Sequence, residues 1–166
     1  MSYVKEVIKN ILEEKEIKKE EVSFYNFLVA RENNEFYAIP IDYINEVCEA
    51  TTENLLKIPL IEDYILGLFN IRGEILPVIS LNKILNLPDS TEKIKYILVV
   101  EHLFKIGLAV EEVKDLYQIS STNLKPIYHS IETKTSNIIP YEFDIEENKV
   151  SNVVDISTLF ESDFLK

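Results

Sequence analysis

The sequence predicts an all-β (mainly β) fold in which two similar small β-units pack against each other. Three observations lead to this prediction. Short apolar stretches separated by polar turns run from residue 23 onward, one part of the chain recurs later with the same spacing, and only the first residues follow a helical pattern. Short strands in this number are typical of β-barrels or a β-sandwich.

Length and composition exclude several classes of protein. The chain has 166 residues and 46% hydrophobic residues, which is enough for one compact domain and too many for a disordered chain. Its apolar runs, such as 96–100, are too short to cross a bilayer. A net charge of -12 argues against broad binding to a phosphate backbone. The N-terminus has no apolar signal core and Cys48 has no cysteine partner, so we expect a cytoplasmic protein without disulfides.

The first residues predict a short amphipathic helix. Apolar residues recur at helical spacing, and they are Val4, Val7, Ile8, Ile11 and Leu12. A charged run follows over 13–21. A helix of this length is marginal alone in water, so its apolar stripe is expected to dock on its own domain or, alternatively, on a partner. We divide the chain into an N-terminal helical extension, 1–22, and a β-domain, 23–166.

The β-domain contains nine strand candidates, bounded by polar turns. Asn33-Asn34 and Glu147-Asn148 stand between apolar stretches, where asparagine favours a hairpin tip. The predicted strands are 24–30, 35–41, 44–49, 66–71, 75–79, 96–100, 105–110, 113–119 and 150–154.

An internal repeat is the most informative feature of the pattern. Residues 36–49 align with 105–118 without a gap, and a strand precedes each copy. Later, 78–85 resembles 153–160, where a strand runs into a short helix capped by Ser80 or Asp155. Chance similarity between strand-rich stretches is the alternative, but matches in the same order favour two copies of one plan. The matched pairs are Ile39 and Leu108, Ile41 and Val110, Asp42 and Glu111, Ile44 and Val113, Glu46 and Asp115, and Val47 and Leu116.

The residues that catalysis or metal binding would use are scattered. His102 and His129 have no cysteine or carboxylate at metal-ligand spacing, so we expect surface or turn positions for both and no metal site. Glu111 and Glu112 are adjacent, and on a strand they would point to opposite faces as solvated charges. Cys48 has no activating neighbour in the sequence and receives no function. The sequence therefore predicts neither an enzyme nor a cofactor site.

The segment 64–81 differs from the rest of the chain. Gly67 and Gly73 are two of only three glycines, and Asn70 to Gly73 has the pattern of a turn between two strands. Arg72 is one of two arginines in a chain that otherwise uses lysine. Because a guanidinium binds a carboxylate as a planar fork, we predict a pair with Glu46; an exposed arginine on a tight hairpin is the alternative.

These residues carry a resemblance to a known family. Residues 67–81 closely resemble the signature G-x-x-N-x-R-G-x-x-x-P-V-x-x-L of CheW-like chemotaxis coupling proteins. Segments 27–29, 37–41 and 44–47 resemble the opening strands of that family, and 107–111 and 153–156 resemble two later strands. The resemblance covers about Phe24 to Phe160 and omits the N-terminal helix.

The resemblance implies two five-stranded β-barrel subdomains and a non-enzymatic adaptor. Such proteins couple the cytoplasmic tips of methyl-accepting chemoreceptors to the regulatory domain of the histidine kinase CheA, within membrane-associated receptor arrays. It also implies that Ile44, Glu46, Gly67 and Arg72 belong to a receptor-binding or coupling region, with Asn70 and Gly73 shaping the turn. No motif marks the kinase-facing surface.

The sequence departs from the family at two places. Glu112 stands where a small residue is common, and 137–144 lacks the glycine that usually precedes the last hairpin. A CheW-like scaffold repurposed in another chemosensory pathway is therefore an alternative function. A β-barrel nucleic-acid-binding module is a further alternative, although the basic stripe that it needs is missing.

Overall fold

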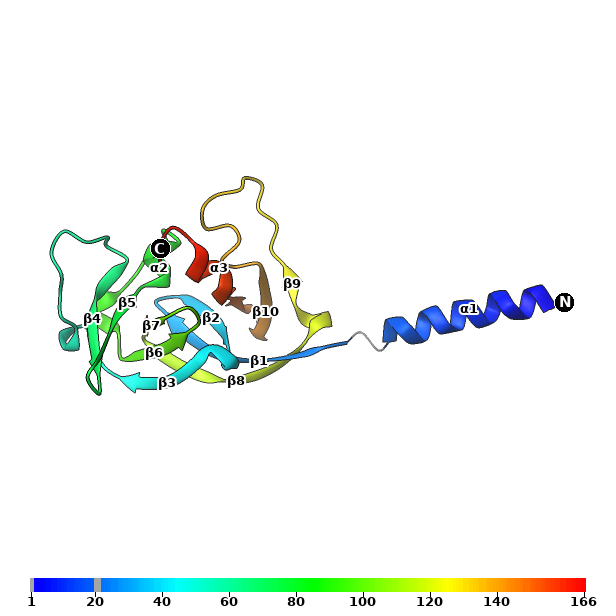
Figure 1. Ribbon diagram of the computed structural model, residues 1–166, viewed down its shortest axis with the longest axis horizontal. Helices are drawn as coiled ribbons and strands as arrows, with labels where there is room; N and C mark the ends of the chain where they lie inside the picture. The colour runs from blue at the N-terminus through cyan, green and yellow to red at the C-terminus, as the bar shows by residue number, and fades with distance from the viewer. Residues whose placement is uncertain (1, 20–21) are drawn as a thin grey trace.

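The described residues form two mainly antiparallel β-sheets and three α-helices, which Figure 1 shows. The computed structural model describes residues 2–19 and 22–166, and the side chains of 3–11 and 22–166. The helices are α1 (Ser2–Lys19), α2 (Leu81–Ile84) and α3 (Ile156–Glu161), with four short 3-10 turns named η1 (Ile41–Tyr43), η2 (Thr52–Asn54), η3 (Thr91–Lys93) and η4 (Ser121–Asn123).

The first barrel is a six-stranded sheet in the order β8-β1-β2-β11-β10-β9. Its sixth strand is only two residues long, so the expected five-stranded barrel is extended by a short edge. All neighbours are antiparallel except β11 and β2, which are parallel. The strands are β1 (Phe24–Glu32), β2 (Glu35–Pro40), β8 (Glu112–Ser120), β9 (Lys125–Pro126), β10 (Tyr141–Glu146) and β11 (Lys149–Val153).

The second barrel is a five-stranded sheet in the order β3-β6-β7-β5-β4. Here β5 and β7 are parallel and the other neighbours are antiparallel. The strands are β3 (Ile44–Glu49), β4 (Ile65–Ile71), β5 (Glu74–Ile79), β6 (Tyr96–Glu101) and β7 (Lys105–Val110). The mainly β fold with two barrel subdomains is confirmed.

All nine predicted strands are present, with bounds shifted by at most a residue or two. The predicted hairpin tips are also confirmed, because Asn33 and Asn148 have φ of 51° and 61° between paired strands. The sequence analysis did not predict strands β9 and β10. Strand β9 is too short to leave a pattern, whereas β10 alternates apolar and acidic residues in the way that a half-buried strand does.

The internal repeat appears as two equivalent sets of elements that exchange partners. Hairpin β1–β2 matches β6–β7, β3 matches β8, and β4–β5–α2 matches β10–β11–α3. Strand β3 leaves its own hairpin to pair with β6, and β8 in turn pairs with β1. Each barrel therefore combines a hairpin from one copy with three strands from the other, and the first barrel adds the short edge strand β9.

The two helices that end the repeats begin as predicted. The side chain of Ser80 accepts a hydrogen bond from the Lys83 N–H at 3.2 Å, and that of Asp155 accepts one from the Thr158 N–H at 3.1 Å. These N-caps satisfy backbone donors that the first helical turn leaves free. Both helices contribute apolar residues to the hydrophobic core between the barrels, for example Ile84 from α2 and Phe160 from α3.

The largest hydrophobic core lies between the barrels. Leu28 and Ile39 of the first sheet join Leu98 and Leu108 of the second in one cluster, and all four are buried. Each barrel also has a smaller core of its own, one around Phe143 and one around Ile97 and Val78. Most of the buried apolar residues in these clusters therefore belong to the core that the two barrels share.

Helix α1 extends away from the barrels (Figure 1). Its described side chains, residues 3–11, are all exposed. The expectation that the apolar stripe docks on its own domain is therefore wrong for Val4, Val7, Ile8 and Ile11, and Leu12 lies outside the described side chains. No helix within residues 2–19 and 22–166 combines the length and the apolar character needed to cross a membrane. The division at residue 22 stays a prediction.

Candidate functional site at the mouth of the second barrel

The turn between β4 and β5 holds Arg72 in a left-handed conformation. Ile71 pairs with Glu74, and the two residues between them, Arg72 and Gly73, have φ of 49° and 85°. Two central residues at positive φ make a type I′ hairpin, whose twist matches that of the strands. The Asn70 side chain accepts the Gly73 N–H at 2.9 Å and fixes the turn from inside. The predicted turn is confirmed.

Arg72 forms an ion pair with Glu46, as the sequence predicted. Glu46 lies on β3 and Arg72 follows β4, and these strands are the two opposite edges of the second sheet. The pair therefore connects the ends of an otherwise open sheet at one mouth of the barrel. The Arg72 side chain is 77% exposed, so the pair contributes little to stability and its guanidinium remains available to a partner.

A second set of charges completes this mouth. Lys105, the first residue of β7, has its Nζ 3.0 Å from Glu74 and 3.9 Å from Glu101. The hydrogen bond to Glu74, together with the charges of Glu101 and Glu46, raises the pKa of Lys105 despite partial desolvation. Acidic and basic groups from all parts of the sheet thus alternate around a hollow of about 290 Å³. Its lining is Asn45, Glu46, Ile71, Arg72, Glu74, Leu76, Val99 and Lys105.

The other predicted site residues lie in the framework of this mouth. Ile44 begins β3 opposite Val100 and packs on the shared core, and a register shift between Ile44 and Glu46 re-aims the following side chains. Gly67 is buried farther along β4, beside the isolated bridge of Leu56 with Leu68. A Cβ there would lie 2.8 Å from the Leu56 carbonyl oxygen. Glycine is therefore required at 67 for close backbone approach.

Comparison with known proteins identifies the family to which this site belongs. Residues 26–164 match the family model of the CheW-like domain, which is most of the chain. The chain belongs to the CheW-like domain family. The match begins within β1, so α1 lies outside it.

Named relatives agree with this assignment. The chain is 25% identical over 133 residues to the Chemotaxis protein CheW of Bacillus subtilis (strain 168), covering 79% of this chain and 83% of that protein. It is 26% identical over 148 residues to the Chemotaxis protein CheW of Helicobacter pylori (strain ATCC 700392 / 26695), covering 88% and 86%. The crystal structure of scaffolding protein TtCheW from Thermoanaerobacter tengcongensis superposes with a TM-score of 0.69 at 26% identity, covering 87% and 97%. The chain is thus a CheW-like member of a chemotaxis scaffold family.

The second arginine of this CheW-like chain has a structural place that the sequence did not reveal. Arg31 donates from Nη1 to Glu111 at 2.7 Å and from Nε to Glu112 at 3.0 Å. The prediction that the two glutamates point apart as solvated charges is therefore wrong. Glu111 lies at the crossover where the chain leaves β7 for β8, so strand alternation does not apply there, and it is only 8% exposed.

Hydrogen bonds keep Glu111 ionised in this setting. Burial opposes its ionisation, but the Ser90 hydroxyl and the Arg31 guanidinium both donate to it, and together they hold the pKa of Glu111 below its ordinary value. The Glu111 N–H also donates to the Arg31 carbonyl at 2.8 Å. This cluster fixes the point at which one repeat passes into the other barrel.

The sequence analysis also did not predict a buried polar network between the two barrels. Glu32 ends β1 and is 1% exposed; its carboxylate accepts from the Ser80 hydroxyl and from the Asn82 N–H at 3.2 Å. The Tyr37 hydroxyl donates to the Asn82 side-chain oxygen at 2.6 Å. Burial raises the pKa of Glu32 to about 7, against these hydrogen bonds, which favour the charged form. Ser80 was predicted as a cap, but no sequence signal marked its partner Glu32.

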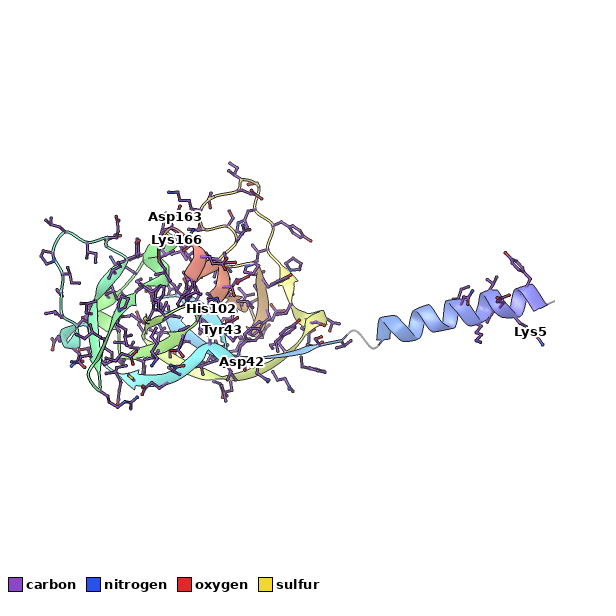
Figure 2. All side chains as sticks on the ribbon, viewed as in Figure 1. Lys5, Asp42, Tyr43, His102, Asp163 and Lys166 are labelled. Atoms are coloured by element: carbon purple, nitrogen blue, oxygen red, sulfur yellow. The ribbon has the colours of Figure 1, made fainter. Side chains whose placement is uncertain are left out.

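The two histidines have the surface positions that the sequence predicted. Both His102 and His129 are exposed. His102 lies edge-on to Tyr43 and to Phe160, with the ring centroids 5.6 Å apart in each pair. Figure 2 shows His102 beside Tyr43. Burial and the neighbouring Glu46 raise the pKa of the Cys48 thiol, which disfavours a thiolate nucleophile. Among the described residues, no group of three or more metal-ligating side chains is close enough to hold an ion.

Proposed function

We propose that this CheW-like chain couples methyl-accepting chemoreceptors to the regulatory domain of a CheA-type histidine kinase. The observation that carries the proposal is the exposed Arg72, held at positive φ and paired with Glu46 across the edges of one sheet. A fixed guanidinium beside carboxylates offers a polar, shape-defined contact that a coupling protein needs and that stability does not explain. The scaffold family of the relatives supports the same reading.

Within this proposal the predicted residues divide into two roles. Glu46 and Arg72 supply the receptor-facing charges, with Ile44 supporting the start of their strand. Asn70 and Gly73 set the turn, and Gly67 acts by letting segment 55–56 approach β4. The protein works without enzymatic activity or a cofactor, in the cytoplasm, at receptor arrays beneath the membrane.

A charge reversal at Arg72 tests the receptor site. Arg72→Glu places two carboxylates together at the barrel mouth, so we expect affinity for a receptor cytoplasmic hairpin to fall about tenfold or more. Calorimetric titration with the receptor hairpin measures this affinity. The matched control is Lys57→Glu, the same charge change at an exposed residue outside the mouth, which should leave affinity unchanged.

Further measurements decide whether the mouth around Arg72 is the receptor site. Receptor affinity and melting temperature both unchanged in Arg72→Glu would remove the assignment of this mouth. A double-mutant cycle with Glu46→Ala separates the ion pair from independent contacts.

The kinase-binding half of the proposal is tested by titration of the unmodified protein with the kinase regulatory domain of the same organism, which should give saturable one-to-one binding. Absence of binding to every such domain would indicate a scaffold repurposed in another pathway.

A further inference from the structure

Helix α1 carries an apolar stripe that nothing in the described structure covers. Val4, Val7, Ile8 and Ile11 fall on one face and are 39–60% exposed. The helix lies outside the CheW-like match, so this surface is an addition of this chain to the family fold. An isolated helix of 18 residues gains most of its stability from covering such a stripe.

The second uncovered apolar surface lies at the base of the same helix. A groove of about 370 Å³ opens beside the first residues of β1. Its floor is buried and apolar, formed by Phe27, Val153 and Ile156, and its rim is half-exposed, with Tyr25 and Tyr141 at 45% and 41%. Apolar grooves of this kind accept the apolar face of an amphipathic helix through anchors at i, i+3, i+4 and i+7.

We propose that α1 is a docking arm for a second copy of this chain. The stripe of each arm lies in the groove of the other copy. The two contacts are then identical, so the exchange closes as a two-fold dimer and leaves neither groove nor stripe uncovered.

The direction of the arm favours a second copy over the chain's own groove. The helix continues outward from β1, and its stripe occupies the distal part, about 12 to 23 Å beyond Lys19 at 1.5 Å per residue (Figure 1). The stripe therefore lies away from the chain's own groove, which is beside the first residues of β1, and it is open to the groove of a second copy.

The charges beside the two surfaces are complementary. Lys5 borders the stripe beside Ile8, whereas Asp155 lines the groove and Asp42 is adjacent to the lining residue Tyr43. Figure 2 shows Lys5 near the tip of the arm, far from Asp42 and Tyr43 of the same chain. A chain with a net charge of -12 repels its copies in general, so opposite charges at this contact favour one orientation over others.

Disulfide trapping tests the arm directly. In a Cys48→Ser background, one protein carries Ile8→Cys and a second carries Leu124→Cys, at the groove. Mixed and oxidised, they should form heterodimers several-fold faster than a mixture in which Glu6→Cys, on the helix face opposite the stripe, replaces Ile8→Cys. Equal rates for both mixtures, or no heterodimer, overturn the proposal.

The double variant Ile8→Cys/Leu124→Cys distinguishes the two possible grooves. A disulfide within monomers, without heterodimers in the mixture, shows that the arm covers its own groove and overturns the second copy as occupant. Light scattering gives an independent readout. We expect twice the 19.3 kDa of one chain. The dissociation constant should rise about tenfold or more in Ile8→Glu but not in Lys9→Gln, which makes the same change in charge on the opposite helix face. A monomer at all concentrations overturns the proposal.

Discussion

The two arginines of this protein both bind carboxylates, but in different settings. Arg31 is 30% exposed and binds two carboxylates and the Asn33 carbonyl, which holds the crossover between barrels in place. Arg72 is 77% exposed and binds one carboxylate at a barrel mouth. The greater exposure of Arg72 supports the receptor-facing role that we propose for it, and residue type alone would not distinguish the two arginines.

Glu32 makes stability depend on pH at the joint between the barrels. Its pKa is about 7 in the folded protein and near the ordinary 4.5 when unfolded, so between these values the folded state binds more protons. The stability that this group supplies is therefore full below about pH 4.5 and lost as the pH rises through 7. The loss is of the order of 3 kcal/mol, at 1.36 kcal/mol per pKa unit.

The variant Glu32→Gln removes this titration. We expect its free energy of unfolding to change less than that of the unmodified protein between pH 5 and 8, and the difference between the two curves isolates Glu32. Urea unfolding at several pH values measures it. The exposed Glu62→Gln is the control and should follow the unmodified curve. Parallel curves for Glu32→Gln and the unmodified protein would contradict a titrating Glu32.

Among the elements, strand β4 is shaped by its one glycine. An added Cβ at Gly67 would lie 2.8 Å from the Leu56 carbonyl oxygen and 2.9 Å from Leu55 Cβ, and the backbone neighbour cannot rotate away. We expect Gly67→Ala to cost about 1–3 kcal/mol and to lower the melting temperature by roughly 2–4 °C per kcal/mol. Calorimetry measures the shift.

The glycine of the adjacent turn is a matched control for Gly67→Ala. Nothing lies within 4 Å of a Cβ built on Gly73, so only its φ of 85° limits substitution, and asparagine tolerates that region. Gly73→Asn should therefore cost less than about 1 kcal/mol. Equal losses at both positions would mean that backbone conformation, not close approach, requires Gly67.

Elements defined by local pattern could be predicted from the sequence, and contacts between elements mostly could not. The caps Ser80 and Asp155 and the turn at Arg72 depend on a few adjacent residues. The Arg72–Glu46 pair was found because arginine is rare in this chain and because both residues stand in recognisable motifs. Strand β10 carried a detectable alternation, whereas the Glu32 network joins segments about fifty residues apart without any local sign.

At the scale of the whole molecule, the exchange of strands makes the barrels interdependent. Each barrel needs β-strands from both copies of the repeat, and the largest hydrophobic cluster draws on both sheets. Removing one copy of the repeat therefore takes strands from both barrels and apolar residues from both sides of the shared core. Although each barrel is a compact sheet, neither contains a continuous chain segment that could fold alone. The structure thus predicts one cooperative unfolding unit.

Native-state hydrogen exchange tests this cooperativity with one mild core change in each barrel. Phe143→Leu lies in the core of the first barrel and Ile97→Val in that of the second, and each should cost about 0.5–3 kcal/mol. The most protected amides are expected in β2 and β7, which lie inside the two sheets. If the barrels unfold together, each variant lowers protection in β2 and β7 by the same free energy. A loss confined to the barrel that carries the substitution would show two separate units, and the strand exchange would then be a feature of topology without energetic consequence.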